Sequence, residues 1–180
     1  MSPMHQLLLN REIYDELIQQ RIPLAKKFLW IVTADIKDMH VEMYGAYVPF
    51  LELLANLVSS GVAVRLIHAK EPGPRFREDF DRYDELVNSD LFERILCPRV
   101  HTKAVIIDSK IAFLGSPNLT GAGMGSKHED KRNFEAGFLF DDPDEIQKLI
   151  SWVDQLYLGE HCKTCKRRDY CPDPIDEYHS

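Results

Sequence analysis

HTKAVIIDSKIAFLGSPN, the stretch from His101 to Asn118, decides the fold. It contains two short apolar runs rich in β-branched residues, separated by the polar triplet Asp108-Ser109-Lys110. Runs of this composition on either side of a turn-forming triplet are typical of paired strands. The stretch therefore predicts two neighbouring strands, at 100–108 and 110–116.

Polar side chains are expected to meet at the open end of this strand pair. Residues two apart on a strand project from the same face, so His101 and Lys103 should lie side by side. The second strand ends in Gly115-Ser116-Pro117-Asn118, next to the start of the first. An ammonium supplies charge to a phosphate, and a hydroxyl and an amide supply oriented hydrogen bonds. This end of the pair is therefore a candidate phosphate site.

Helices and strands alternate along the rest of the chain. Further strands are predicted at 28–36, 62–69 and 133–140. Helices are predicted over 10–22 (with Asn10 as N-cap and Pro23 at the end), 47–61, 76–87 and 143–159. A strand, a helix and a strand in succession imply a right-handed parallel crossover. The pattern predicts an α/β sandwich with a central mixed sheet flanked by helices, in one catalytic domain over 1–159 and a short tail over 160–180.

Composition limits the classes of function. The chain has 180 residues, with 22 Lys and Arg against 29 Asp and Glu, for a net charge of −7. A protein that coats nucleic acid through its phosphates has the opposite sign, so any such contact must use a local basic patch. No apolar run approaches the roughly 20 residues that cross a bilayer, and the N-terminus does not resemble a signal peptide. We expect a cytoplasmic protein that does not bind membranes.

The spacing H-x-K-x4-D-x6-G-S-x-N, which starts at His101, resembles the signature of the phospholipase D superfamily of lipases, synthases and nucleases. The resemblance implies that the chain cleaves phosphodiesters and that His101 is the nucleophile, forming a phosphohistidine. It also implies that Lys103 and Asn118 hold the phosphoryl oxygens with support from Ser116. Asp108, which completes the signature, would support the site rather than touch the phosphate.

Two residues downstream extend the resemblance. Asn133 and Glu135 in RNFEAG are similar to an asparagine and a glutamate that follow the motif in that family. The resemblance implies that Glu135 accepts a hydrogen bond from one ring nitrogen of His101, which leaves the other free to attack.

The chain carries one complete motif. Of three H-x-K matches, at His68, His101 and His161, only the middle one is followed by the aspartate and by G-S-x-N. The family's chemistry uses two histidines, one to attack and one to protonate the leaving oxygen. The resemblance thus implies a homodimer with one shared site, and a reaction that needs no metal ion.

Four cysteines form a second pattern, C-x2-C-x5-C at Cys162, Cys165 and Cys171, with Cys97 far upstream. Four thiolates suit a structural zinc ion or a [4Fe–4S] cluster. The spacing resembles the iron–sulfur spacing of some RecB-like nucleases, whereas zinc is the commoner use of C-x2-C. His161 could replace Cys97 as the fourth ligand, and four free thiols are the alternative. A metal here would tether the tail to the strand of the motif.

Basic residues near the predicted site indicate the substrate. Lys127, Lys131 and Arg132, with His128, lie between Asn118 and Glu135, and Arg75 and Arg77 follow a Pro-Gly-Pro loop. A basic patch on an acidic protein favours a polyanion, so we expect an endonuclease acting on DNA or RNA. Two alternatives remain: hydrolysis of a phospholipid or other small phosphodiester, and a nucleic-acid-binding subunit without catalysis.

Overall fold

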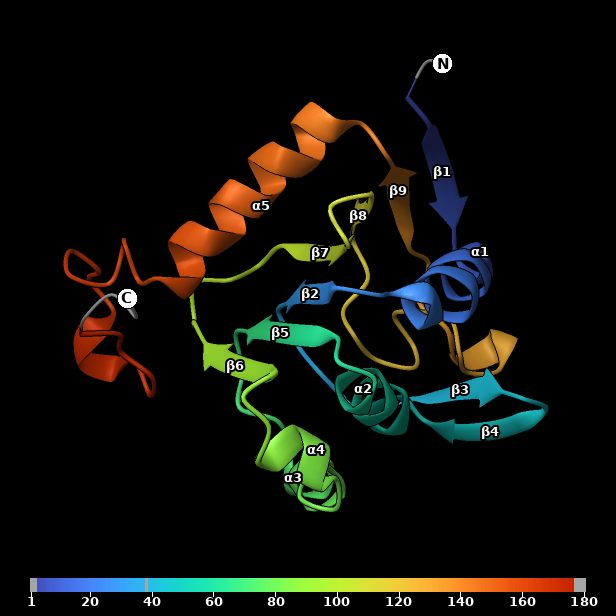
Figure 1. The fold of residues 1–180 in the computed structure, drawn as a ribbon, viewed down its shortest axis with the longest axis horizontal. Coiled ribbons are helices and arrows are strands. Elements are labelled where there is room, and N and C mark those ends of the chain that lie inside the picture. Colours follow the sequence, from blue (N-terminus) through green and yellow to red (C-terminus); the bar gives the residue numbers. More distant parts are fainter. Residues whose placement is uncertain (1–2, 38, 177–180) are drawn as a thin grey trace.

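A computed structural model describes residues 3–37 and 39–176. Within them, seven strands form one mixed sheet in the order β1-β9-β8-β7-β2-β5-β6 (Figure 1). The strands are β1 His5–Leu9, β2 Phe28–Thr33, β5 Ala63–His68, β6 Phe92–Leu96, β7 Lys103–Ile107, β8 Ile111–Gly115 and β9 Ala136–Phe140. The strands β2, β5 and β6 are parallel, and the other pairs are antiparallel. The predicted mixed sheet and the strand pair around the motif are confirmed.

Helices cover both faces of the sheet (Figure 1). One face carries α1 Arg11–Ile13, η1 Tyr14–Arg21, η2 Ile22–Leu24, α2 Phe50–Ser59, α3 Pro74–Phe80 and α4 Asp84–Val87, and the other carries α5 Pro143–Tyr157. Strand β7 contributes to both layers, because Val105 and Ile107 join the larger core and Ala104 and Ile106 join the core under α5. A strand buried on both faces reads as an unbroken apolar run, which is the pattern seen in the sequence.

The N-terminal helix differs from the prediction. It continues past Pro23 as a short 3-10 turn, and most of it is π-helical. Asn10 makes no side-chain cap and has a φ of 51°. Its side chain instead accepts a hydrogen bond from the backbone N–H of Glu135, 3.0 Å away. A tertiary contact therefore replaces the predicted N-cap.

Several elements were missed. The predicted helix over 47–61 begins only at Phe50, because a hairpin of β3 His40–Met43 and β4 Ala46–Pro49 precedes it. The predicted helix over 76–87 is divided into α3 and α4. Strands β1 and β6 were also not predicted, since each is short and gains its backbone partners from distant segments.

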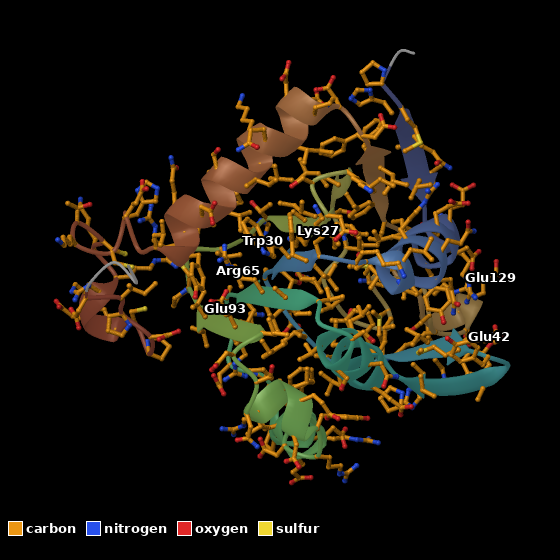
Figure 2. All side chains as sticks on the ribbon, viewed as in Figure 1. Lys27, Trp30, Glu42, Arg65, Glu93 and Glu129 are labelled. Carbon is orange, nitrogen blue, oxygen red and sulfur yellow. The ribbon has the colours of Figure 1, made fainter. Side chains whose placement is uncertain are left out.

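Arg65 fastens α5 to the sheet (Figure 2). Its guanidinium lies 4.1 Å from the ring centroid of Trp30 and 3.7 Å from that of Tyr157. It also donates hydrogen bonds to Asp154, at 2.8 Å, and to Glu93, at 3.2 Å. Arginine combines planar stacking with fork-like donors, so one side chain can join β2, β5, β6 and α5.

No helix among the described residues is long and apolar enough to span a bilayer.

Candidate active site

The motif lies at the edge of the sheet where β7 begins and its neighbours β2 and β8 end. Because β7 runs antiparallel to β2, with Val32 opposite Ala104, the start of β7 lies beside the end of β2. Lys103 is the first residue of β7 and pairs with Gly115, the last residue of β8. His101 lies two residues before Lys103 and is exposed. The strand pair therefore brings both ends of the signature to the same edge, as the sequence predicts.

Lys103 is a buried cation. Its exposed fraction is 9%, and the other buried polar side chains of the described chain are Thr33 and His68. Thr33 pairs with His68 and follows Val32, which pairs with Ala104, so the three polar residues form a row across β7, β2 and β5. No carboxylate within the described residues forms an ion pair with Lys103. Its ammonium is therefore an unpaired positive charge at this edge, which suits a bound phosphate.

Asn118 is held by the loop after β2. Its side-chain oxygen accepts a hydrogen bond from the backbone N–H of Asp35, at 3.1 Å. The Thr33 hydroxyl accepts another from the N–H of Leu119, at 3.0 Å. Since the Asn118 oxygen is occupied, its amide NH₂ remains as the donor for a phosphoryl oxygen. Sequence reasoning missed Thr33 and Asp35, although their place at the end of a buried strand was a usable signal.

The pairing of β8 with β9 brings Glu135 to Ser116. The Ser116 hydroxyl donates a hydrogen bond to one carboxylate oxygen of Glu135 and accepts one from the N–H of Ala136, at 3.1 Å. The amide of Asn133 donates to the other oxygen of Glu135, also at 3.1 Å. Asn133 and Glu135 thus belong to the same cluster as the end of the signature.

One expected contact is not found. Among the described residues there is no hydrogen bond between Glu135 and His101; the two Glu135 oxygens accept from Ser116 and Asn133 instead. In the single chain, Glu135 therefore positions Ser116. Its predicted action on His101 stays a prediction.

The glycine that precedes Ser116 is required by packing. A Cβ added to Gly115 would come within 2.7 Å of the carbonyl oxygen of Ala136 and 2.8 Å of the Cα of Gly137. Heavy atoms at that distance overlap, so a larger residue would push β8 away from β9. The glycine keeps Ser116 within reach of Glu135.

Asp108 lies away from the edge that carries Lys103, at the opposite end of β7. Its carboxylate accepts hydrogen bonds from the backbone N–H groups of Lys26, Lys27 and Phe28, at 2.9, 2.7 and 3.0 Å. Burial would raise the pKa of the Asp108 carboxyl, but these hydrogen bonds outweigh burial and lower it. A strand rises about 3.3 Å per residue, so Asp108 is some 17 Å along the chain from Lys103. It is a structural part of the signature.

Replacing Asp108 by Asn is expected to destabilise the fold by about 2 kcal/mol at pH 7, because hydrogen bonds to a charged acceptor are lost. Asn tolerates the φ of 55° found here, so the change isolates the charge. The lowered pKa means that the stabilisation is present above about pH 4 and is lost as pH falls through the folded-state pKa. Urea unfolding at pH 7 and pH 3 measures both effects. Exposed Asp81→Asn is the control, and equal stability of the two variants at pH 7 would contradict the assignment.

The predicted substrate residues lie on the loop that leads to Asn133. Lys127 and Lys131 are exposed, whereas Arg132 is half-buried and donates to the carbonyl of Lys127. The loop folds back through a hydrogen bond from the Asn133 N–H to the Ala122 carbonyl, at 3.1 Å. Lys127 and Lys131 are therefore free to meet a substrate, while Arg132 shapes the loop.

A basic cleft was not predicted as a unit. Lys37, Arg75 and Arg82 line it together with His40 and Asp79, and Arg82 is ion-paired with Asp79 at 2.8 Å. The backbone N–H of Lys37 donates to the carbonyl of Leu119, at 3.0 Å, which joins the cleft to the segment that carries Asn118. Of the two arginines expected after the Pro-Gly-Pro loop, Arg75 lines this cleft, and Arg77 pairs with Glu71 instead.

All four cysteines line one cavity beside the end of β6. Burial, and to a smaller extent the nearby Cys162 and Cys171 thiols, raises the pKa of Cys97. The backbone N–H of Arg167 and the side chain of Arg99 lower the pKa of Cys165. No three His, Cys, Asp or Glu side chains of the described chain are grouped like the ligands of a single metal ion. The four predicted ligand cysteines lie around one cavity, no zinc-like grouping is found among the described residues, and a metal at this place stays a prediction.

The other two H-x-K matches have no place in this edge cluster. His68 is fully buried in β5, where its Nδ1 lies 2.7 Å from the carbonyl oxygen of Lys70 and burial lowers its pKa. His161 lies in the exposed tail, at the rim of a hollow that also contains Cys97, Cys162 and His101.

A histidine, a lysine, an amide and a serine–glutamate pair thus gather at one edge of the mixed sheet. The family model described as "Cardiolipin synthase, PLD-like domain" matches residues 18–157. The chain therefore belongs to the phospholipase D-like phosphodiesterase superfamily.

Solved structures with the same fold support this assignment. NucT from Helicobacter pylori superposes with a TM-score of 0.65 at 19% identity, over 86% of this chain and 95% of that one. Nuc from Salmonella typhimurium, described as a phospholipase D family member, gives 0.62 at 17% identity, over 87% and 95%. TrmBL2, an archaeal chromatin protein with a novel mode of DNA binding, gives 0.57 at 13%, over 85% and 52%. No curated protein matched the sequence significantly.

Proposed function

We propose that this chain is a metal-independent endonuclease that acts through a phosphohistidine at a site shared by a homodimer. The observation that carries the proposal is the Lys103 side chain, largely buried and without an ion pair among the described residues, at the sheet edge where His101 and Asn118 also lie. An unpaired cation beside free donors suits a phosphate diester.

In the proposed reaction, one ring nitrogen of His101 attacks the phosphorus. The bond from phosphorus to the leaving oxygen breaks, and His101 of the partner subunit donates a proton to that oxygen. A water molecule then attacks the phosphohistidine while His101 of the partner subunit accepts its proton. The phosphorus–nitrogen bond breaks and the phosphate monoester leaves. Lys103 and Asn118 stabilise the phosphoryl oxygens in both steps.

Charge supports a nucleic acid as the substrate. The exposed Lys127 and Lys131 and the Arg75 of the cleft offer positive charge on a chain with a net charge of −7, whereas Lys37 and Arg82 of the cleft are paired with aspartates. A chain of phosphates can contact the site and the cleft together, whereas one lipid headgroup contacts a single point. Phospholipid hydrolysis is the second candidate, favoured by the cardiolipin synthase description of the matching family.

One panel tests the function. Single- and double-stranded DNA, RNA, phosphatidylcholine vesicles and a chromogenic phosphodiester are each incubated with the protein in EDTA. We expect cleavage of at least one nucleic acid, with the same rate in EDTA and in magnesium. Cleavage of the lipid alone would replace the nuclease proposal, and loss of all activity in short EDTA incubations would refute the metal-independent mechanism. Any metal at the four cysteines would be structural and take no part in this reaction.

The surface beside the site supports the dimer. Leu7, Phe138 and Leu114 lie opposite one another on β1, β9 and β8, in a row that ends two residues from Ser116. Their exposed fractions are 50%, 50% and 43%. A contiguous apolar row on a sheet face is costly in water, and a second copy related by a two-fold axis would cover it.

Phe138→Glu is therefore expected to convert the dimer to a monomer and to lower activity at least tenfold, because the second His101 is lost from the site. Light scattering gives the mass, and the panel above gives the activity. Tyr47→Glu on the β3–β4 hairpin, where the side chain is 66% exposed, is the matched control and should remain an active dimer. A fully active Phe138→Glu monomer would contradict the shared site.

A further inference from the structure

The tail has too little core to hold itself together. None of the residues 160–176 is buried, yet they form a compact series of turns. Two hydrogen bonds attach them to the end of β6 and the segment that follows it: Leu96 N–H donates to the Asp173 carboxylate at 2.9 Å, and Arg167 donates to the Pro98 carbonyl at 3.1 Å. Small units without an apolar core are usually stabilised by disulfides or metals.

The turns of the tail place its cysteines in line. Backbone N–H groups donate to the carbonyl three residues earlier at Cys162, Cys165, Arg168 and Cys171, with distances of 2.8, 3.2, 3.1 and 3.1 Å. In such turns the side chains at every third residue fall on one side. The spacing of the cysteines therefore follows the period of the turns, and three thiols face a common cavity.

The fourth thiol comes from the catalytic domain. Cys97 follows β6, and its N–H donates to the carbonyl of His68 at 2.8 Å, which fixes it at the end of the sheet. It lines the same cavity as the three tail cysteines, 65 residues away in sequence from Cys162. The four cysteines of the chain thus surround one space.

The way the four thiols are grouped distinguishes between a zinc ion and a [4Fe–4S] cluster as the bound group. Four thiolates on one zinc ion stand about 3.8 Å apart, given zinc–sulfur bonds of about 2.3 Å in a tetrahedron. No such grouping exists among the described residues, although all four thiols line one cavity. A [4Fe–4S] cluster binds one thiolate at each of four separated iron atoms, so it fits thiols that surround a space without touching.

The charged residues around the cavity also suit a [4Fe–4S] cluster. Four thiolates around a cluster core of charge +2 carry a net charge of −2. Arg99, Arg167 and Arg168 line the cavity together with Asp173. Arg168 donates to the carbonyls of Cys162, at 3.5 Å, and Ile175, at 3.3 Å, and is ion-paired with Asp176, so the positive charge at the cavity comes mainly from Arg99 and Arg167. Arginines around an anionic centre lower the cost of burying it.

We propose that Cys97, Cys162, Cys165 and Cys171 ligate one [4Fe–4S] cluster that pins the tail to the segment carrying His101. The four thiols release their protons as they bind iron. Cys97 is four residues before His101, and both residues line a hollow shared with Cys162 and Cys165. The cluster is therefore a structural clamp next to the catalytic segment, and it makes the tail part of the folded unit.

The test uses the full chain expressed with added iron and purified without oxygen. We expect about four iron and four acid-labile sulfide per chain, a broad visible absorption band that dithionite bleaches, and an electron paramagnetic resonance signal after reduction. Cys97→Ser and Cys165→Ser should each lower the iron content at least fourfold. Exposed Thr164→Ala, inside the same turns, should keep it.

The outcomes separate this proposal from the nuclease proposal. His101→Ala should keep the full cluster signal, because the cluster does not depend on activity. Chelation of the wild-type protein should lower its melting temperature, which gives a stability readout even where a cysteine variant fails to fold. One zinc per chain, two disulfides, or a metal-free chain whose melting temperature iron and sulfide do not change would each overturn the cluster.

Discussion

His101→Ala is expected to lower phosphodiesterase activity at least about 10³-fold, because the phosphohistidine intermediate can no longer form. Losses of this size or larger follow removal of the nucleophile in other covalent enzymes. His101 is exposed, so its removal opens no cavity, and the melting temperature should change by less than about 2 °C. The measurement is the rate on the preferred substrate of the panel, with far-ultraviolet circular dichroism as the check on folding.

A trapping experiment makes the same prediction sharper. Brief incubation with substrate labelled at the scissile phosphate, followed by alkaline quenching, should leave label on the wild-type protein that acid removes. His101→Ala should carry none, and His5→Ala, another exposed histidine, should behave like the wild type. A His101→Ala variant with more than a tenth of the wild-type activity would refute His101 as the nucleophile.

Lys103→Met should produce the second large loss, about 10²- to 10³-fold, with little or no loss of stability. The methionine has a similar length and keeps the packing of the largely buried stem, and the change breaks no ion pair among the described residues, so the melting temperature should change little. The charge that stabilises the developing phosphoryl negative charge is lost with the ammonium. A large loss of activity without a loss of stability distinguishes a phosphate-binding lysine from one that supports the fold.

Inorganic phosphate supplies a readout apart from catalysis. A ligand that binds only the folded state raises the melting temperature, so phosphate should stabilise the wild type and have a smaller effect on Lys103→Met. Lys110→Met, an exposed lysine at the far end of β7, is the matched control and should keep both activity and the phosphate effect. Unchanged activity in Lys103→Met would contradict the proposed site.

Local pattern was a good guide wherever neighbouring segments in the sequence are also neighbours in space. The two strands around the turn at Asp108 pair with each other, and their shared edge carries His101, Lys103 and Ser116 as expected. The resemblance already set Asp108 apart from the residues that would touch the phosphate, and the structure gives the physical reason. Asp108 completes the spacing as well as the others, but the length of β7 separates it from Lys103.

What the sequence by itself determined was the family, the sheet edge that carries the motif, and the alternation of helices and strands, because these rest on short-range spacing and burial. Only the tertiary structure decided the long-range contacts: β1 on β9, Asn10 on Glu135, and Asp35 on Asn118. It also showed that Cys97 and the three cysteines of the tail line one cavity. These contacts form between segments far apart in the chain, so they depend on the order of the strands in the sheet, which local propensity does not encode.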